Sequence, residues 1–250
     1  MTKILFQTTC FSCALLLSAC VTNDDLMNGA QAFLKQHQSS ANNATTTLTS
    51  AQMVAGLKDA LNVGTNIVVT QLGKQGGFNL DPKIRIPLPD TMKKIDTALA
   101  KIGMNSLTSD LENRMNAAAE MAVPQAKELF IASIRQMTFT DAKQILFSGQ
   151  QDAATQYLRK TMGTELANRV QPIVTSTLQK TGAVQAYDRV LGQYATLPFV
   201  SDVKTDMNNY VTQKALDGVF FYVAKEEAAI RENPAKRTTE ILRTVFGQVQ

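Results

Sequence analysis

Apolar residues recur along this chain at the spacing of an α-helix, most regularly between residues 111 and 162. Within that stretch, one side of the expected helix carries Leu129, Phe130, Ser133, Ile134 and Met137. Positions three, four, seven and eight residues apart share one side of a helix, whereas a half-buried strand requires strict alternation. The spacing therefore predicts a helix with one face buried in a core.

The same pattern extends over the rest of the chain. A helix is predicted to begin at Ser50, a typical N-cap residue, and to end at Gly76 and Gly77. Pro124 removes a backbone N–H, so the central helix is expected either to kink there or to be two helices. Other helices are expected at residues 90–103, from Asp152, and at 165–180, 184–194 and 205–231. The chain is thus predicted to be all-α, with one multi-helix globular domain over residues 50–250.

Residues 78–89 interrupt the helical pattern. Ile84, Ile86 and Leu88 alternate there with charged residues and prolines. Proline cannot donate a backbone hydrogen bond, which excludes a central strand of a sheet. A short extended arm or an edge strand is predicted for these residues.

The N-terminus has the order of an export signal. Lys3 precedes an uncharged, largely apolar run that is too short to span a membrane and that ends in Leu-Ser-Ala-Cys. These four residues resemble the lipobox of bacterial lipoproteins. The resemblance implies that residues 1–19 are a lipoprotein signal peptide and that Cys20 receives a diacylglyceryl group. The alternative is an ordinary export signal in which Cys20 has no role.

Residues 20–49 are rich in Ser, Thr and Asn and are expected to form the lipidated Cys and a flexible tether. A flexible chain of that length has a root-mean-square reach of roughly 30 Å. Val21 stands where Asp would signal retention in the inner membrane of enteric-type bacteria. A lipoprotein of the outer membrane of a Gram-negative bacterium, facing the periplasm, is therefore expected.

Cysteine and histidine usage excludes several chemistries. The cysteines are Cys10, Cys13 and Cys20, and His37 is the sole histidine, expected on a solvated surface. This usage excludes disulfides in the mature domain, thiol catalysis, Ser-His-Asp catalysis and multi-histidine zinc sites. A phosphate-binding glycine-rich loop and a G-x-S-x-G elbow are also missing. No catalytic residue, metal or cofactor is predicted.

The net charge of +4 is mild. A nucleic-acid-binding protein would show clustered Lys and Arg with interleaved aromatic residues, so no nucleic-acid partner is expected. Basic residues do gather around the arm and could contact anionic lipid or an acidic envelope component, although a solvated surface is the simpler interpretation. They are Lys74, Lys83, Arg85, Lys93 and Lys94.

A polar group lies opposite the apolar stripe of the central helix. Asn113, Asn116 and Glu120 are three and seven residues apart and share that face. A carboxylate flanked by amides could bind a polyol or a peptide. The alternative is a solvated helix face.

One acid falls inside an apolar stripe of the late helix. Glu227 lies between Val223 and Ile230, and a buried carboxylate must be paired or protonated. Arg231, four residues on, is expected to form a structural ion pair with Glu227 that reaches toward the edge of the core. The alternatives are a functional carboxylate or a pair with Arg114 on another helix.

Several blocks resemble one bacterial family. They are MNAAAEMAVPQAKELFIASIRQMTFTDAKQIL, AATQYLR, EEAAIRENPAKRTTEILRTVFG and the IPLP of the arm. They resemble the family catalogued as domain of unknown function 4197, over roughly residues 50–247. The resemblance implies a helical, exported bacterial protein and carries no activity or catalytic residue.

Two functions remain for comparison. The first is a non-enzymatic envelope lipoprotein that binds a periplasmic protein or a lipid, or that acts as an adaptor. The second is a carboxylate-based envelope enzyme, for example acting on glycan through Glu120 and Glu227, since two acids in a cleft suffice for that chemistry. The excluded chemistries favour the first.

Overall fold

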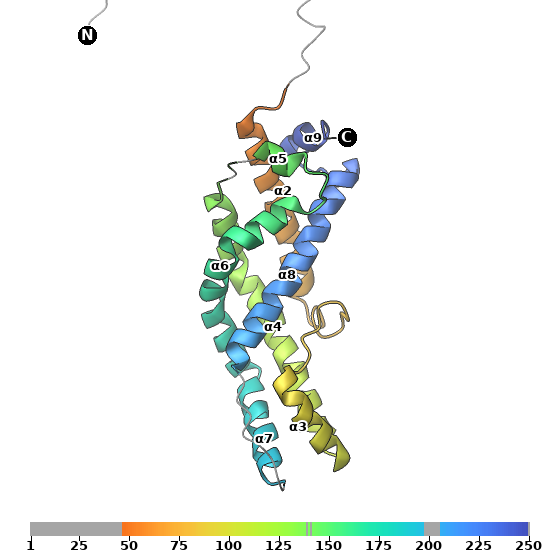
Figure 1. Ribbon diagram of the computed structural model, residues 1–250, viewed down its shortest axis with the longest axis vertical. Helices are drawn as coiled ribbons and strands as arrows, with labels where there is room; N and C mark the ends of the chain where they lie inside the picture. Colours follow the sequence, from red (N-terminus) through yellow and green to blue (C-terminus); the bar gives the residue numbers. More distant parts are fainter. Residues whose placement is uncertain (1–46, 139, 141, 198–205, 250) are drawn as a thin grey trace, which may run out of the picture. The chain divides into compact units, whose positions relative to one another are not determined.

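The computed structural model of the protein describes residues 47–138, 140, 142–197 and 206–249 (Figure 1). The expected signal peptide, Cys20, His37 and the tether as far as residue 46 lie outside the described residues. The described residues after 47 belong to one compact unit.

The prediction of an all-α domain is confirmed, since the described residues form helices and no strand. In chain order the helices are α2 (Ser50–Leu72), α3 (Asp90–Lys101), α4 (Asn105–Gln136), α5 (Ala142–Leu146), α6 (Ala153–Lys180), α7 (Ala183–Ala195), α8 (Met207–Glu232), the 3-10 helix η1 (Pro234–Lys236) and α9 (Glu240–Phe246).

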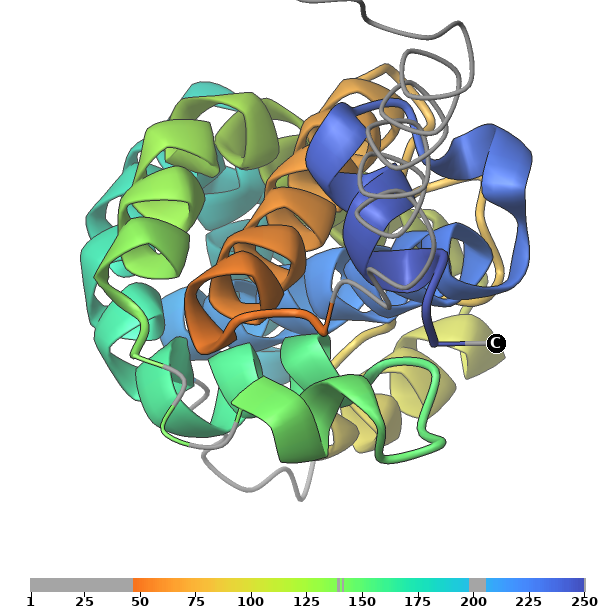
Figure 2. The ribbon, with the colours of Figure 1, turned by 90° about the horizontal axis from the view of Figure 1, so that it is seen from above.

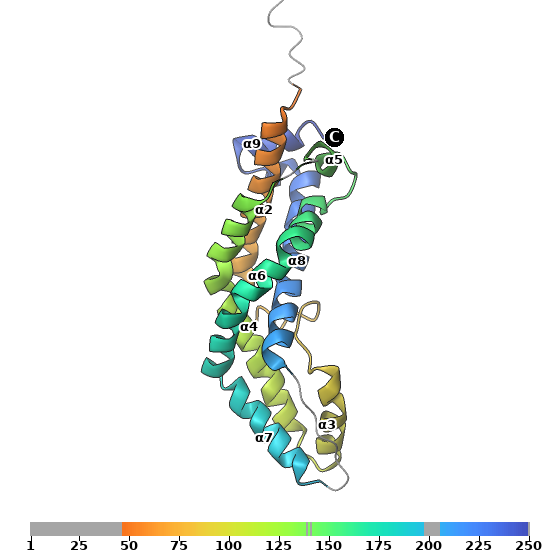
Figure 3. The same cartoon turned by 60° about the vertical axis from the view of Figure 1, so that its left-hand side comes forward.

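Four long helices, α2, α4, α6 and α8, pack on one another and enclose the core of this unit (Figures 1 and 2). The shorter helices cover its two ends. Helices α5 and α9 contact α2 near its first residues, whereas α3 and α7 pack against the beginning of α4 (Figure 3). Each long helix contributes the apolar stripe that its sequence predicts.

Helix α2 begins with a complete capping box. The Thr49 hydroxyl accepts a hydrogen bond from the Gln52 N–H at 3.2 Å, and the Gln52 side chain accepts one from the Thr49 N–H at 2.9 Å. The cap is therefore Thr49 and not Ser50, because the glutamine three residues after Thr49 completes the box. Leu48 packs against the core, so the folded unit begins two residues before the expected boundary.

Two helices are continuous where the sequence suggested more than one. Helix α4 is a single helix across Pro124, where a kink or two helices were the alternatives, and α6 is a single helix over the expected helices from Asp152 and at 165–180. The Pro124 ring packs against Gly73 so closely that a Cβ on Gly73 would lie 2.5 Å from Pro124 Cγ. Tertiary packing thus compensates for the lost hydrogen bond at Pro124. The expectation of two separate helices, one from Asp152 and one at 165–180, is wrong.

The arm at residues 78–89 consists of turns in its first half and has no regular secondary structure in its second half. Residues 82–84 form a turn, and the Arg85 N–H donates to the Asp81 carbonyl at 2.8 Å. Residues 85–89 form neither a helix nor a strand, so the edge-strand alternative is wrong. Phe78 and Ile86 are fully buried, and they anchor the arm on the helices.

Within the described residues, none of the helices combines the length and apolar character that crossing a membrane demands.

Candidate functional site

Glu120 and Asn116 on α4 hold the arm by its backbone. Glu120 is buried, and its Oε1 accepts hydrogen bonds from the N–H groups of Phe78 and Asn79, both at 3.0 Å. Asn116 accepts from the Ile86 N–H at 2.8 Å and donates to the Ile86 carbonyl at 2.9 Å. The amide therefore satisfies both backbone groups of Ile86, as a neighbouring strand would.

The predicted polar patch is divided by this arrangement. Only Asn113 is exposed, and the Arg85 Nη2 lies 3.5 Å from its Oδ1. Asn116 and Glu120 are buried beneath the arm, so the expectation of a solvated face is wrong for both. The peptide that this face binds is the chain's own backbone.

Glu227 on α8 holds the beginning of α6. Its carboxylate accepts from the Ala154 N–H at 3.0 Å, from the Thr155 N–H at 2.8 Å and from the Thr155 hydroxyl at 2.7 Å. The first N–H groups of a helix lack partners within it and form the positive end of its dipole. Glu227 thus provides the cap that the Asp152 side chain does not provide.

Arg231 completes this buried cluster. Its Nη2 lies 2.8 Å from Glu227 Oε1, and its Nη1 donates to the Leu146 carbonyl at 3.0 Å. The guanidinium also lies over the Phe246 ring, 5.4 Å from the centroid. The side chains of Glu227 and Arg231 are only 1% and 5% exposed, so the pair is enclosed and does not reach the edge as expected.

Arg114, the alternative partner of Glu227, lies elsewhere. Its Nε donates to both oxygens of Asp110 at 2.9 Å, and its Nη1 donates to the Thr181 carbonyl at 2.7 Å. Glu120 and Glu227 share none of the partners described above. Among the described residues, no three Cys, His, Asp or Glu side chains gather as metal ligands.

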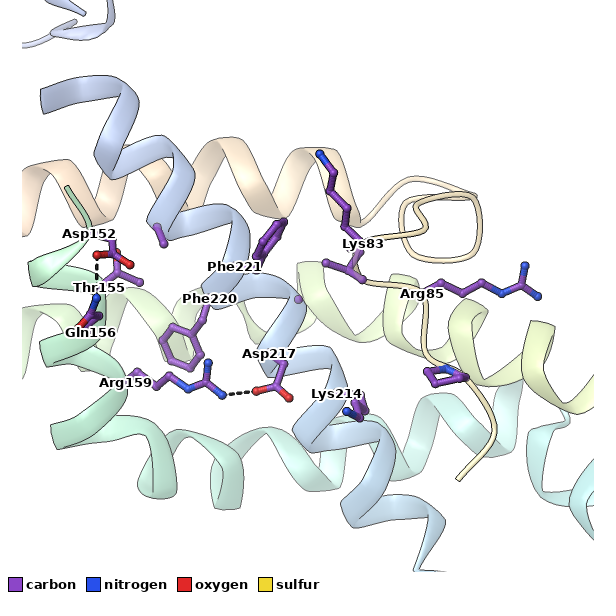
Figure 4. A pocket seen from close by; sticks show the side chains of 14 residues that line it. Lys83, Arg85, Asp152, Thr155, Gln156, Arg159, Lys214, Asp217, Phe220 and Phe221 are labelled. Carbon is purple, nitrogen blue, oxygen red and sulfur yellow. Dashed lines mark hydrogen bonds and ion pairs between the residues drawn. The ribbon is translucent and has the colours of Figure 1, made fainter. Parts of the chain in front are cut away.

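A pocket lined by both charged and aromatic residues, called the main pocket, lies on α8 between the arm and α6 and has a volume of about 430 Å³ (Figure 4). Its α8 side includes Lys214, Asp217, Gly218 and Phe221, which recur at helical spacing, together with Phe220 and Ala224. Gly218 leaves room for the arm, because a Cβ there would lie 2.8 Å from Phe78 Cε1. The volume falls within the range of ligand-binding pockets.

Cations outnumber acids in the pocket. Its charged residues are Lys83, Arg85, Asp152, Arg159, Lys214 and Asp217. Arg159 pairs with Asp217 across α6 and α8, and its guanidinium lies 5.6 Å from the centroid of the Phe220 ring. Arg85 pairs with Glu112 at 2.7 Å. Among the described residues Lys83 and Lys214 take part in no ion pair, and the Lys214 Nζ lies 5.9 Å from the centroid of the Tyr210 ring.

A second charged group borders the pocket beside Phe221. The Tyr222 hydroxyl donates to Asp81, and this hydrogen bond raises the pKa of Tyr222 to about 12 and lowers the pKa of Asp81. The Lys225 Nζ lies 4.6 Å from the centroid of the Phe221 ring. Desolvation and the neighbouring Lys83 ammonium lower the pKa of Lys225.

The basic residues predicted around the arm do not form one surface. Lys83 and Arg85 line the main pocket, whereas Lys93 and Lys94 line a separate hollow on α3. Lys74 lies just after the end of α2 and lines neither.

Sequence reasoning missed the central residues of the pocket. Arg159 and Asp217 are 58 positions apart, and only the packing of α6 on α8 brings them together. The sequence shows that Lys214, Asp217 and Phe221 have helical spacing, but it does not show that this face of the helix lines a pocket.

Fold and site together define a class: an all-helical domain with a cationic pocket between its arm and two long helices. The chain belongs to the family described as "Protein of unknown function (DUF4197)", whose model matches residues 47–247. This finding confirms the resemblance in the sequence. No curated protein matches the chain, and no solved structure matches it.

Proposed function

We propose that this protein is an exported bacterial lipoprotein whose helical domain binds an anionic ligand without catalysing a reaction. Residues 1–19 would act as its signal peptide, and diacylated Cys20 would anchor the mature chain to a membrane facing the periplasm. Val21 supports the outer membrane as the destination. The partner of the pocket would be a lipid or an acidic segment of a periplasmic protein.

The cationic lining of the main pocket is the observation that carries the binding proposal. Four cations and two acids line it, with Arg85 paired to Glu112 outside the pocket, and Phe220 and Phe221 provide apolar surface beside them. Pockets that combine apolar walls with a few charged groups bind small ligands in many proteins. The excess positive charge selects an anion.

The positions of the acids favour binding over catalysis. Glu120 and Glu227 were the carboxylates available for an enzyme, and neither lines the main pocket. Each accepts hydrogen bonds from two backbone N–H groups of another segment. Both therefore have a sufficient role in holding the fold.

Lipidation is tested by mass spectrometry of the protein purified from its own cells. The expected N-terminus is a diacylated Cys20, and Cys20→Ser is expected to prevent both the modification and membrane anchoring. An intact Met1, or an unmodified soluble chain, would contradict this half of the proposal.

Ligand binding is tested by native mass spectrometry of the same purified protein. A non-covalent adduct is expected in the wild type and is expected to be reduced in the double variant Arg159→Gln, Lys214→Gln. The matched control is Lys143→Gln, Lys180→Gln, which removes the same charge from exposed positions outside the main pocket. Equal adducts in both variants, or no adduct in the wild type, would contradict the binding role.

A further inference from the structure

We infer that the main pocket binds the phosphate group of an amphiphilic ligand, with Arg159 and Lys214 as its phosphate contacts and Phe221 beside its apolar part. This inference rests on the proposed binding role of the pocket, and it names the class of ligand.

Arg159 and Lys214 flank one acid. Asp217 pairs with Arg159 from α6 and lies three residues after Lys214 on α8, and Figure 4 shows Arg159 and Lys214 on either side of it. Two cations around one carboxylate leave a surplus charge. A phosphate offers three acceptor oxygens and up to two negative charges, and a guanidinium matches it geometrically.

The existing ion pair is easily exchanged. The side chains of Arg159 and Asp217 are 56% and 43% exposed, and exposed pairs contribute little stability. Arg159 is also held over the Phe220 ring, so its guanidinium remains in the pocket when Asp217 is released. Asp217 therefore acts as an internal competitor of the ligand anion.

The apolar requirement comes from Phe221. Its side chain is 39% exposed and lines the pocket, beside Ile84 and Pro87 of the arm. An acyl or other apolar group would cover this surface. A bare inorganic anion would leave it in water.

The opposite side of the pocket is cationic as well. Lys83 lines it, and Lys225 lies over the Phe221 ring just outside it. Desolvation and then repulsion by the Lys83 ammonium lower the pKa of Lys225. A negatively charged ligand would relieve that repulsion.

The test uses a single fluorophore, because the chain contains no tryptophan. Phe221→Trp places a reporter in the pocket, and Phe147→Trp places one at another exposed phenylalanine as a control. The full-length protein, in micelles of an uncharged detergent, is titrated with inorganic phosphate, glycerol 3-phosphate, dioctanoyl phosphatidic acid, octanoate and octyl glucoside. Calorimetry of the wild type with the same ligands shows whether the tryptophan itself alters binding.

Dioctanoyl phosphatidic acid is expected to shift the emission of the Phe221→Trp protein and to bind about tenfold or more tightly than inorganic phosphate, because it also covers apolar surface. The double variant Arg159→Gln, Lys214→Gln is expected to weaken binding by about tenfold or more, since two charge-assisted contacts are lost. Asp217→Asn is expected to tighten binding several-fold. Asp188→Asn, the same charge change at an exposed position outside the pocket, is expected to have no effect.

The source of the phosphate is distinguished by a second arm. Nanodiscs of phosphatidylcholine with and without phosphatidylglycerol present the headgroup in a bilayer, whereas glycerol 3-phosphate presents it free. A response to the anionic nanodiscs identifies a lipid headgroup, whereas a response to glycerol 3-phosphate alone would refute the amphiphilic character of the ligand.

An equal response to octyl glucoside, tighter binding of octanoate than of the phosphate ligands, or weaker binding by Asp217→Asn would overturn the inference. The proposed function fails separately, when native mass spectrometry finds no adduct that depends on the pocket. A pocket-dependent adduct without phosphorus would leave the binding role intact and refute the phosphate assignment.

Discussion

Replacing Glu227 by Leu should destabilise the domain strongly, because this carboxylate joins three segments of the fold. It accepts hydrogen bonds from the first residues of α6, and it pairs with Arg231, which in turn binds the Leu146 carbonyl before α6 begins. Leucine preserves the approximate volume of the side chain but none of these interactions.

The magnitude follows from what the substitution leaves behind. The Ala154 and Thr155 N–H groups lose their acceptor, and the Arg231 guanidinium, 5% exposed, loses its counter-ion. Removing one member of a buried ion pair costs about 3–5 kcal/mol. We therefore expect Glu227→Leu to cost about 4 kcal/mol, which lowers the Tm by about 8–16 °C in a domain of this size.

Glu227→Gln should cost less, about 2–3 kcal/mol, because one amide oxygen still accepts while the new NH2 group faces other donors. This value exceeds the cost of about 1 kcal/mol that a pair at the protein surface would predict. The burial of the carboxylate accounts for the difference.

Thermal unfolding followed by circular dichroism measures these losses. The matched control is Glu165→Gln, because Glu165 and Arg169 form a pair with the same i,i+4 spacing that is 49% and 41% exposed. That change should cost about 0.5 kcal/mol or less. A double-mutant cycle of Glu227→Leu with Arg231→Leu should give a loss smaller than the sum of the single losses.

Two results would refute this reasoning. One is a Tm loss for Glu227→Leu no larger than that of Glu165→Gln. The other is strict additivity with Arg231→Leu, which would show that the cluster is not a coupled unit.

Three other substitutions test the arm and its surroundings. Asn116→Leu should destabilise the domain by about 2–3 kcal/mol, because the two backbone groups of Ile86 lose their partners, and should expose the arm to limited proteolysis; unchanged cleavage would contradict this. Gly218→Ala should cost about 1–3 kcal/mol in denaturant unfolding, since the new Cβ would lie 2.8 Å from Phe78 Cε1; no loss would show that Phe78 moves freely. The free energy of unfolding should fall between pH 10 and pH 12, because the Tyr222 hydroxyl ionises near pH 10 in the unfolded chain but has a pKa of about 12 in the folded protein. Tyr222→Phe should remove that part of the pH dependence, and an unchanged profile would contradict its origin.

The existence of the helices could be predicted because each buries an apolar stripe whose period is visible in the sequence. Leu111, Met115, Ala118 and Ala122 share such a stripe and are all buried. Where one helix ends and the next begins was harder to predict from the sequence. Pro124 breaks the pattern locally, and only its contact with Gly73 shows why α4 continues.

Polar residues were harder to interpret, because their roles depend on partners far along the chain. Asn116 and Glu120 have the spacing of a solvated face, yet they are buried by backbone from 30 and 42 positions away. A polar side chain at such a position can be recognised as a fold-holding residue only when its partner is known.

The Glu227 cluster shows which part of a buried interaction the sequence contains. The partner four residues away on the same helix follows from helical geometry, and Arg231 lies there. The other partners, the N–H groups of residues 154 and 155, belong to the backbone and therefore leave no trace in residue identity. These backbone contacts, and the Leu146 carbonyl bound by Arg231, enclose the ion pair. The expected free-energy cost of losing Glu227 is therefore that of a buried ion pair and not that of an exposed one. A lone acid in an apolar stripe is therefore better interpreted as a side chain that binds unpaired backbone groups, and the first N–H groups of a neighbouring helix are the first place to look for them.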